Sequence, residues 1–245
     1  MGLIGYLIYF NTIKSDGFIN SPYNTRQDTF ADRVVRGKIM SSDGEVLAQT
    51  NVSEDGTEER SYPYNNVFAH VVGYDSNGKS GLESEANFQL LSSHEFFLNQ
   101  IRNEFMGTKN TGDTVVSTLN ADLQTTAYNS LGDRRGAVVA LEPSTGKILA
   151  LVSKPDFDPN TISENWDTLV NDETNSSLLN RATMGQYPPG STFKVVTALD
   201  YFRTRGSFNG FSFDCQGSIT KENHTIQCYN GKVHGTEDFY TAFAN

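Results

Sequence analysis

The chain has 245 residues, room for one large domain or two ordinary ones, and 37% of them are hydrophobic, enough to bury a core. Its formal net charge of -10 leaves no basic stripe to neutralise phosphates, which argues against a nucleic-acid-binding protein. Two cysteines are too few for a fold built on disulfides.

The N-terminal segment, residues 1–10, is uncharged and mostly apolar. A bilayer core of about 30 Å needs about 20 such residues, so this segment alone cannot span it. No basic residue precedes the apolar run and no small-residue cleavage site follows it, so a signal peptide fits poorly. The residues by themselves favour a short buried segment over the outer half of a membrane anchor.

The next part of the chain predicts a small mixed module. Residues 11–35 are polar and turn-rich, as in a connector, and Asp43-Gly44 between two apolar runs indicates a hairpin. Residues 81–105 place Leu and Phe at helical intervals, which predicts a helix. Residues 111–119 alternate briefly and predict a strand.

A mixed α/β pattern follows, from a natural boundary near residues 106–120. Asn120 can cap a helix over residues 120–131. The apolar runs 137–141 and 148–152 flank a Pro-Ser-Thr-Gly turn and predict a hairpin in a central sheet that is covered on both faces.

The clearest chemical motif lies around Ser191. Pro188 and Pro189 disfavour helix before Gly190, which permits an unusual backbone angle, so a helix can begin at Ser191. Lys194 follows just under one turn later, and the two side chains point the same way. The hydroxyl then lies at the positive end of the helix dipole and the lysine can take its proton, which makes a nucleophile and its base. The ordinary alternative is a helix capped by a serine, with a lysine on its surface.

The flanking sequence favours the catalytic interpretation. The segment NRATMGQYPPGSTFKVVTALDYF resembles the active-site segment of class B penicillin-binding proteins, the peptidoglycan DD-transpeptidases. VVRGKIMSSDGEVLA resembles their N-terminal pedestal signature, GLE at Gly81 to Glu83 their linker, and GAVVALEPSTGKILALVSKPDFDPN the start of their transpeptidase domain. SPYNTRQDTFADRVVRG is close to the elongation-type members of Gram-positive bacteria, often called penicillin-binding protein A.

The resemblance implies an α+β chain of three parts. Residues 1–12 are the remnant of a membrane anchor, 13–117 a mixed pedestal or dimerisation-like module with its linker, and 118–245 the N-terminal portion of a penicillin-binding transpeptidase domain, which is serine β-lactamase-like. It reverses the interpretation of the N-terminus, which now resembles the outer end of a membrane helix. The implied location is the extracytoplasmic face of the cell membrane.

The resemblance also implies the chemistry. Ser191 is the acylated nucleophile and Lys194 its general base. The family attacks the D-Ala-D-Ala carbonyl of a peptidoglycan stem peptide, releases D-Ala and passes the acyl group to an amine of a neighbouring stem; β-lactams acylate the same serine. The implied partners are therefore stem peptides, β-lactams and a membrane glycosyltransferase that contacts the pedestal, and no cofactor is required. The alternatives are a β-lactamase or β-lactam-sensing domain, and a non-catalytic pedestal that only binds the membrane partner.

Besides its shortened N-terminal anchor, the chain departs from the family pattern at two places. Its pedestal turn is Ser41-Ser42-Asp43-Gly44, where an Asp-Arg-Asn-Gly type is usual. The motif set also includes Ser-x-Asn and Lys-Thr-Gly, and the chain stops at Asn245, where the family is about to present Ser-x-Asn on the next helix. We therefore expect residues 1–245 alone to be catalytically incompetent, or nearly so.

Cys215, Cys228 and His234 form the second candidate site. A disulfide between the cysteines, two free thiols, and three ligands of a structural zinc are all open, and the residues favour the disulfide. The resemblance adds that some elongation-type members hold a zinc beside the active site, with ligands in this segment.

Four other residues are expected to play supporting roles. His70 and His94 are expected to be structural, and Arg181 and Tyr187 to shape the site rather than react.

Overall fold

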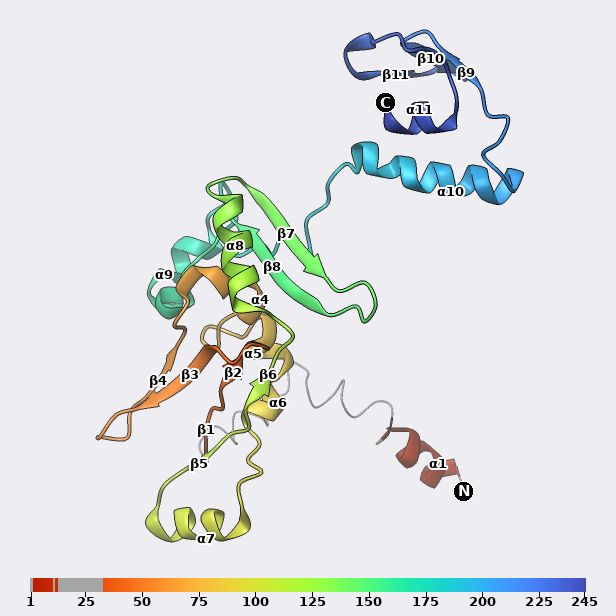
Figure 1. Ribbon diagram of the computed structural model, residues 1–245. Coiled ribbons are helices and arrows are strands. Elements are labelled where there is room, and N and C mark those ends of the chain that lie inside the picture. The colour runs from red at the N-terminus through yellow and green to blue at the C-terminus, as the bar shows by residue number, and fades with distance from the viewer. Residues whose placement is uncertain (1, 11, 13–32) are drawn as a thin grey trace. The chain divides into compact units, whose positions relative to one another are not determined.

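The computed structural model describes residues 2–10, 12 and 33–245 and forms two compact units, Met1–Gly185 and Gln186–Asn245 (Figure 1). The elements of the first unit are α1 (Gly2–Tyr9), β1 (Val34–Val35), β2 (Ile39–Met40), β3 (Val46–Val52), β4 (Glu58–Ser61), η3 (Asn65–Phe68), α4 (Ala69–Val72), α5 (Gly81–Glu85), α6 (Asn87–Leu90), α7 (Phe97–Met106), β5 (Asn110–Thr111), β6 (Val115–Val116), α8 (Ala121–Leu131), β7 (Gly136–Leu141), β8 (Ile148–Lys154), η4 (Pro159–Thr161) and α9 (Ile162–Val170). Those of the second unit are η5 (Gly190–Phe193), α10 (Lys194–Arg205), β9 (Phe213–Cys215), β10 (Ser218–Lys221), β11 (His224–Gln227), η6 (Tyr229–Gly231), β12 (Gly235–Glu237) and α11 (Phe239–Ala244). The predicted module boundary between residues 117 and 118 lies inside the first unit.

The N-terminal helix α1 has eight residues, and its side chains are exposed. Within the part of the chain that the structure describes, no helix has both the length and the apolar character of a membrane span. Most of the connector predicted for residues 11–35 lies outside the described residues.

The pedestal is built on a four-stranded sheet with the order β4-β3-β2-β6. β2 and β3 are antiparallel across the predicted Asp43-Gly44 turn, and Gly44 adopts the positive φ of 92° that this turn needs. β2 also pairs in parallel with β6, so the strand predicted over residues 111–119 is confirmed in shorter form.

The single helix predicted over residues 81–105 is wrong. The chain forms α5 and α6, leaves the helical path at residues 92–96, and resumes as α7. The backbone of the break pairs with a later segment instead: Asp113 N–H donates to the Ser92 carbonyl at 2.7 Å, and the Asp113 carboxylate accepts from His94 N–H at 3.0 Å. Hydrogen-bond partners from residues 110–113, distant in sequence, therefore override the local helical pattern.

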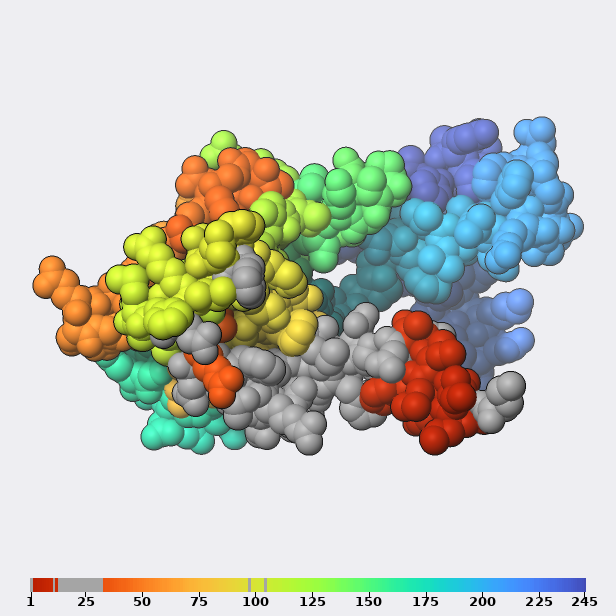
Figure 2. Space-filling view, turned by 90° about the horizontal axis from the view of Figure 1, so that it is seen from below, coloured from red at the N-terminus to blue at the C-terminus, as the bar shows by residue number. Residues whose placement is uncertain are grey.

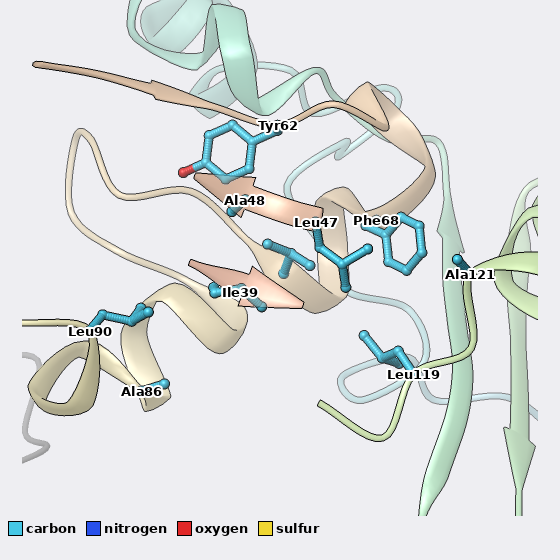
Figure 3. Close-up of a cluster of buried hydrophobic side chains, with 10 residues drawn as sticks. Ile39, Leu47, Ala48, Tyr62, Phe68, Ala86, Leu90, Leu119 and Ala121 are labelled. Carbon is cyan, nitrogen blue, oxygen red and sulfur yellow. The ribbon is translucent and has the colours of Figure 1, made fainter. Parts of the chain in front are cut away.

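The core of the pedestal draws on both sides of the predicted module boundary (Figure 3). Its buried apolar residues are Ile39, Leu47, Ala48, Tyr62, Phe68, Val72, Ala86, Leu90, Leu119 and Ala121. The last two come from the segment that enters α8. The pedestal core is thus closed by the first residues of the predicted transpeptidase part.

A buried ion cluster lies beside this core. The Glu83 carboxylate is fully buried and accepts from Arg36 Nε at 2.7 Å and Arg60 Nε at 2.8 Å. Gly37 lies so close to the 112–113 backbone that an added Cβ would be 2.0 Å from the Asp113 carbonyl oxygen. The residues of the pedestal and linker signatures, Arg36, Gly37 and Glu83, therefore hold the pedestal together from inside.

Helix α8 joins the pedestal to the β7–β8 hairpin. Asn120 caps it as predicted, because its side chain accepts from Leu123 N–H at 2.8 Å. The buried Gln124 amide donates to the carbonyls of Val67 and Leu151 and accepts from Leu151 N–H, each at 2.8 Å. Gln124 thus bridges the pedestal and β8 with one side chain.

The predicted hairpin is confirmed, since β7 and β8 pair antiparallel. β8 is mostly buried, but Val139 and Leu141 of β7 are exposed, and β7 and β8 pair only with each other among the described residues. The expectation of a sheet covered on both faces is therefore not met within the first unit.

The segment after β8 packs on the pedestal. Phe157 and Ile162 form a second buried cluster with Ala69, and Trp166 packs against it. The Asn160 side chain accepts from Tyr62 N–H at 2.8 Å and donates to the Tyr62 carbonyl at 3.0 Å. These contacts explain why the pedestal and the first transpeptidase strands form one unit.

Candidate active site

The turn before α10 positions the two candidate catalytic residues. Gly190 has φ of 55°, a left-handed conformation that glycine adopts without strain, and the chain then forms the 3₁₀ turn η5. Thr192 Oγ1 donates to the Pro189 carbonyl at 2.6 Å and fastens the turn. The predicted helix start is therefore confirmed in position, although its first turn is 3₁₀ and the α-helix begins at Lys194.

Ser191 and Lys194 lie one 3₁₀ turn apart, a spacing at which side chains eclipse one another and point the same way. Both line a cavity of about 360 Å³ within the second unit. Ser191 is exposed and Lys194 half-buried, so the hydroxyl is open to a ligand while the lysine stem is partly covered. The two candidate catalytic residues thus line the same space.

The second candidate site lines the same cavity. β9 and β12 pair antiparallel with Cys215 beside Gly235, and Cys228 N–H donates to the Gly217 carbonyl at 2.9 Å. These contacts bring the donor atoms of Cys215, Cys228 and His234 within 4.8 Å of one another. The predicted trio therefore converges, and it does so next to Ser191 and Lys194.

The distances among Cys215, Cys228 and His234 bear on the three alternatives, which are a disulfide, two free thiols and the ligands of a zinc ion. Cys215 Sγ lies 3.5 Å from both Cys228 Sγ and His234 Nδ1, and both cysteines are thiols. A disulfide needs a separation of about 2.05 Å. In a tetrahedron with Zn–S bonds of about 2.3 Å and Zn–N bonds of about 2.0 Å, the donor atoms lie about 3.5 to 3.8 Å apart. The two distances from Cys215 Sγ are therefore close to those around a zinc ion, while a disulfide would require the sulfur atoms to move together.

Local hydrogen bonds make Cys215 the more acidic thiol. The backbone of Gly217 and, after it, the His234 ring stabilise the thiolate and lower the pKa of Cys215 to about 7. The hydrogen bond between the two sulfur atoms raises the pKa of Cys228. A metal or an oxidant would thus meet Cys215 first as a thiolate.

Neither Glu237 nor the triplet Ser207-Phe208-Asn209 was singled out from the sequence. Glu237 lines the same cavity with a buried side chain and accepts from Asn245 Nδ2. The triplet Ser207-Phe208-Asn209 has the letters of a Ser-x-Asn motif, but it follows the far end of α10. At 1.5 Å per residue it lies about 20 Å along the helix from Ser191, too far to share its chemistry.

The supporting residues lie in different places. His70 is half-buried in the first unit with Nε2 3.3 Å from the Pro155 carbonyl, and His94 is exposed and pairs with Asp113. The buried Arg181 donates to the carbonyls of residues 175, 176 and 179 and so fixes that loop. Tyr187 is 60% exposed, just before the 188–190 turn.

Two family models match the chain in order. Residues 36–115 match the penicillin binding protein A dimerisation domain, and residues 136–245 match the penicillin binding protein transpeptidase domain. The peptidoglycan D,D-transpeptidase PbpA of Mycolicibacterium smegmatis is 39% identical over 203 residues, which are 75% of this chain and 40% of the relative. The peptidoglycan D,D-transpeptidase MrdA of Escherichia coli is 31% identical over 184 residues, 60% of this chain and 29% of the relative.

Solved structures agree with these matches. Penicillin-binding protein A of Mycobacterium tuberculosis, as its ceftriaxone acyl-enzyme complex, superposes with a TM-score of 0.76 at 30% identity, covering 89% of this chain and 53% of that one. The D,D-transpeptidase domain of a peptidoglycan glycosyltransferase from Eggerthella lenta gives a TM-score of 0.74 at 32% identity, covering 86% and 47%. This chain thus spans about half of these structures and 40% of the PbpA relatives. Because a pedestal module and the start of a transpeptidase domain follow one another in the expected α+β arrangement, the chain belongs to the class B penicillin-binding proteins.

Proposed function

We propose that the chain supplies the nucleophile and general base of a serine peptidoglycan D,D-transpeptidase. The observation that carries the proposal is that Ser191 and Lys194 lie one turn apart on the wall of one cavity, at a helix start. Lys194 Nζ, in its neutral form, takes the proton from Ser191 Oγ as the oxygen attacks the D-Ala-D-Ala carbonyl. Lys194 gives this proton to the D-Ala nitrogen as the C–N bond breaks. The amine of a second stem peptide then attacks the acyl group, and its proton passes through Lys194 to Ser191 Oγ as the ester bond breaks.

The turn would also stabilise the negative charge that develops during the reaction. The N-terminal end of α10 carries the positive end of the helix dipole, which favours developing negative charge on the attacking oxygen. The Ser191 backbone N–H would be one donor to the oxyanion of the tetrahedral intermediate. Residues 1–245 carry the Ser-x-x-Lys motif and span 40% of the PbpA relative, and we propose that these residues alone react far more slowly than the full-length relatives.

Covalent labelling tests this proposal. After long exposure to a fluorescent penicillin, peptide mapping should find the adduct on Ser191, formed slowly, absent from Ser191→Ala and strongly reduced in Lys194→Ala. Ser207→Ala is the matched control, since it removes a serine at the other end of α10 and should leave the label unchanged. A label on another residue would refute the role of Ser191. A rate near that of PbpA relatives would refute only the low activity of these residues.

A β-lactamase is the competing enzyme, because it uses the same Ser-x-x-Lys start. The match of residues 36–115 to a dimerisation module favours the transpeptidase, since a free-standing β-lactamase does not need a pedestal. Release of hydrolysed penicillin in repeated turnovers would favour the β-lactamase, whereas a stable acyl-enzyme is expected here.

For the trio beside the site, we propose a structural zinc held by Cys215, Cys228 and His234. Its support is that His234 Nδ1 lies 3.5 Å from Cys215 Sγ, a contact that a disulfide does not need, and that all three donor atoms lie within 4.8 Å of one another. Bound zinc would cross-link β9 with the loop that precedes β12, and so fix one wall of the cavity. Metal analysis together with thiol counting separates zinc from the disulfide and from free thiols.

The membrane partner and the extracytoplasmic location are the last part of the proposal. A glycan-polymerising membrane protein is expected to contact the pedestal. Arg36 and Gly37 are buried or tightly packed, so substituting them would disturb the pedestal rather than a contact surface. Pull-down with exposed pedestal positions substituted is therefore the sharper test.

A further inference from the structure

Three apolar side chains of helix α7 are exposed. Leu98, Phe105 and Met106 are 61%, 90% and 62% exposed, and Phe96, just before the helix, is 69% exposed. A surface helix ordinarily turns its apolar stripe toward the core. In Figure 2 the yellow-green residues around α7 lie on the face toward the viewer. Adjacent exposed apolar side chains of this size mark a surface that meets something other than water.

The opposite face of α7 is polar and hydrogen-bonds to the segments on either side of the helix, including β5. Gln100 Nε2 donates to the Glu95 carbonyl at 2.9 Å, and Asn103 Nδ2 donates to Asn110 Oδ1 at 3.0 Å. The Asn103 carbonyl accepts from Thr108 N–H at 2.9 Å. Because the attachment is polar, the apolar face stays available for a partner.

The position of α7 in the chain suggests what that partner is. β5 begins four residues after α7 and pairs in parallel with β1, so that Asn110 lies beside Val34. Among the described residues, β1 is the first strand after the uncharged apolar helix α1. α7 therefore lies at the end of the pedestal that the chain reaches from its apolar N-terminal segment.

The charge on this face favours a lipid surface over a second copy of the chain as the partner. Arg102 is exposed and lies one turn from each of Leu98, Phe105 and Met106. Apolar side chains around a guanidinium suit the boundary between acyl chains and anionic headgroups. If two copies paired antiparallel across the middle of α7, their Arg102 side chains would meet at the two-fold axis and repel each other.

We propose that the outer face of α7, formed by Leu98, Arg102, Phe105 and Met106, lies on the surface of a bilayer that contains anionic phospholipid. The proposal rests on the proposed function, in which the chain works at the outer face of a membrane. The apolar side chains enter the boundary between headgroups and acyl chains, and Arg102 pairs with a lipid phosphate. α7 would then set the height and tilt of the pedestal over the membrane.

A local probe tests this in the full chain, in which α1 can also bind lipid. Phe105→Trp adds a second tryptophan, and subtracting the spectrum of the parent, whose single tryptophan is Trp166, isolates its emission. With vesicles of phosphatidylcholine and phosphatidylglycerol, we expect the emission of the introduced tryptophan to shift to shorter wavelength and to be quenched by brominated acyl chains. Val52→Trp, at an exposed apolar position on β3, is the matched control and should show neither effect.

A second variant tests the charge. Arg102→Gln should weaken partitioning onto phosphatidylglycerol-containing vesicles about fivefold and leave partitioning onto phosphatidylcholine alone unchanged. Because Arg102 is exposed, the variant should keep the parent's thermal midpoint, which checks its fold.

Three outcomes would overturn the proposal. The first is that vesicles retain the Phe105→Trp variant without any change in the emission of the introduced tryptophan, and the second is that neither lipid retains the chain. The third is an emission shift that follows protein concentration without lipid, which would identify a second copy as the partner. Penicillin labelling of Ser191 is independent of this readout, so failure of the proposed transpeptidase function is recognised separately.

Discussion

The two units of this protein bury their apolar side chains to very different extents. The first unit contains three buried clusters and the Glu83 ion cluster. In the second, no residue of α10 is buried, and Val195, Val196 and Leu199 are each more than half exposed. Burial of apolar area is the main favourable term in folding, and among the described residues most of the buried apolar side chains lie in the unit without the candidate nucleophile.

The comparison shows that the reactive turn depends on local backbone preferences, whereas the stable core depends on contacts between residues that are distant in sequence. Pro188, Pro189 and Gly190 set the turn before Ser191 through backbone preferences alone. The joint between the pedestal and β8 instead requires Gln124 and Asn160 to meet residues about 60 to 100 positions away in the chain, as the Gln124–Val67 and Asn160–Tyr62 bonds do. Substitutions should therefore act strongly in the first unit and weakly on the exposed face of the second.

The largest effect is expected from Glu83→Ala. It would leave two guanidinium groups, Arg36 and Arg60, in the core without their counter-charge, which costs about 3–5 kcal/mol. Urea unfolding followed by the fluorescence of Trp166 measures the loss, because Trp166 packs in the first unit. Glu85→Ala, two residues on and exposed, is the control and should change stability by less than about 0.5 kcal/mol. Equal stability of the two variants would show that the ion cluster is not needed.

The next effect is expected from Gln124→Ala. The substitution leaves the carbonyls of Val67 and Leu151 and the Leu151 N–H without their partner inside the joint, which costs about 2–3 kcal/mol. The same urea measurement applies, with the exposed Gln89→Ala as control. If Gln124→Ala unfolds like the control, water replaces the amide and the joint is held by its apolar contacts.

A smaller effect is expected from pH at His70. Burial, its largest cause, lowers the pKa of His70 below the ordinary value, so the folded protein binds fewer protons than the unfolded chain. The stabilisation is present above a pH of about 6.5 and is lost as the pH falls toward the folded-state pKa. Unfolding free energies measured from neutral to mildly acid pH should show this loss, and His70→Gln should reduce it. An unchanged pH slope in His70→Gln would assign the loss to carboxylates.

The smallest effect is expected from Val195→Thr, on the exposed face of α10. The change should alter stability by less than about 0.5 kcal/mol, whereas Val72→Thr, the same change in the fully packed pedestal core, should cost about 1–3 kcal/mol. Thermal unfolding followed by circular dichroism compares the pair. A large loss from Val195→Thr would mean that the face of α10 is covered in solution, and the contrast between the units would disappear.

Some features followed from the sequence because they depend on neighbouring residues. The Asp43-Gly44 and 142–146 turns, the Asn120 cap and the positive φ of Gly190 are each set by the preferences of one or two residues. The convergence of Cys215, Cys228 and His234 corresponds to one of the three alternatives that the sequence leaves open, although the residues favour the disulfide. The helix over residues 81–105 was mispredicted because Asp113 competes for its backbone groups, and no local pattern reveals a competitor that distant.

The sequence by itself determined the family, the Ser-x-x-Lys turn and the order of the modules, since motifs and turn preferences are local properties of the chain. Only the tertiary structure decided that the pedestal core is closed by Leu119 and Ala121, that Gln124 joins the pedestal to β8, and that three apolar side chains of α7 are exposed. A periodic pattern says that a helix has an apolar face, but only the packing of the other elements decides whether that face is covered.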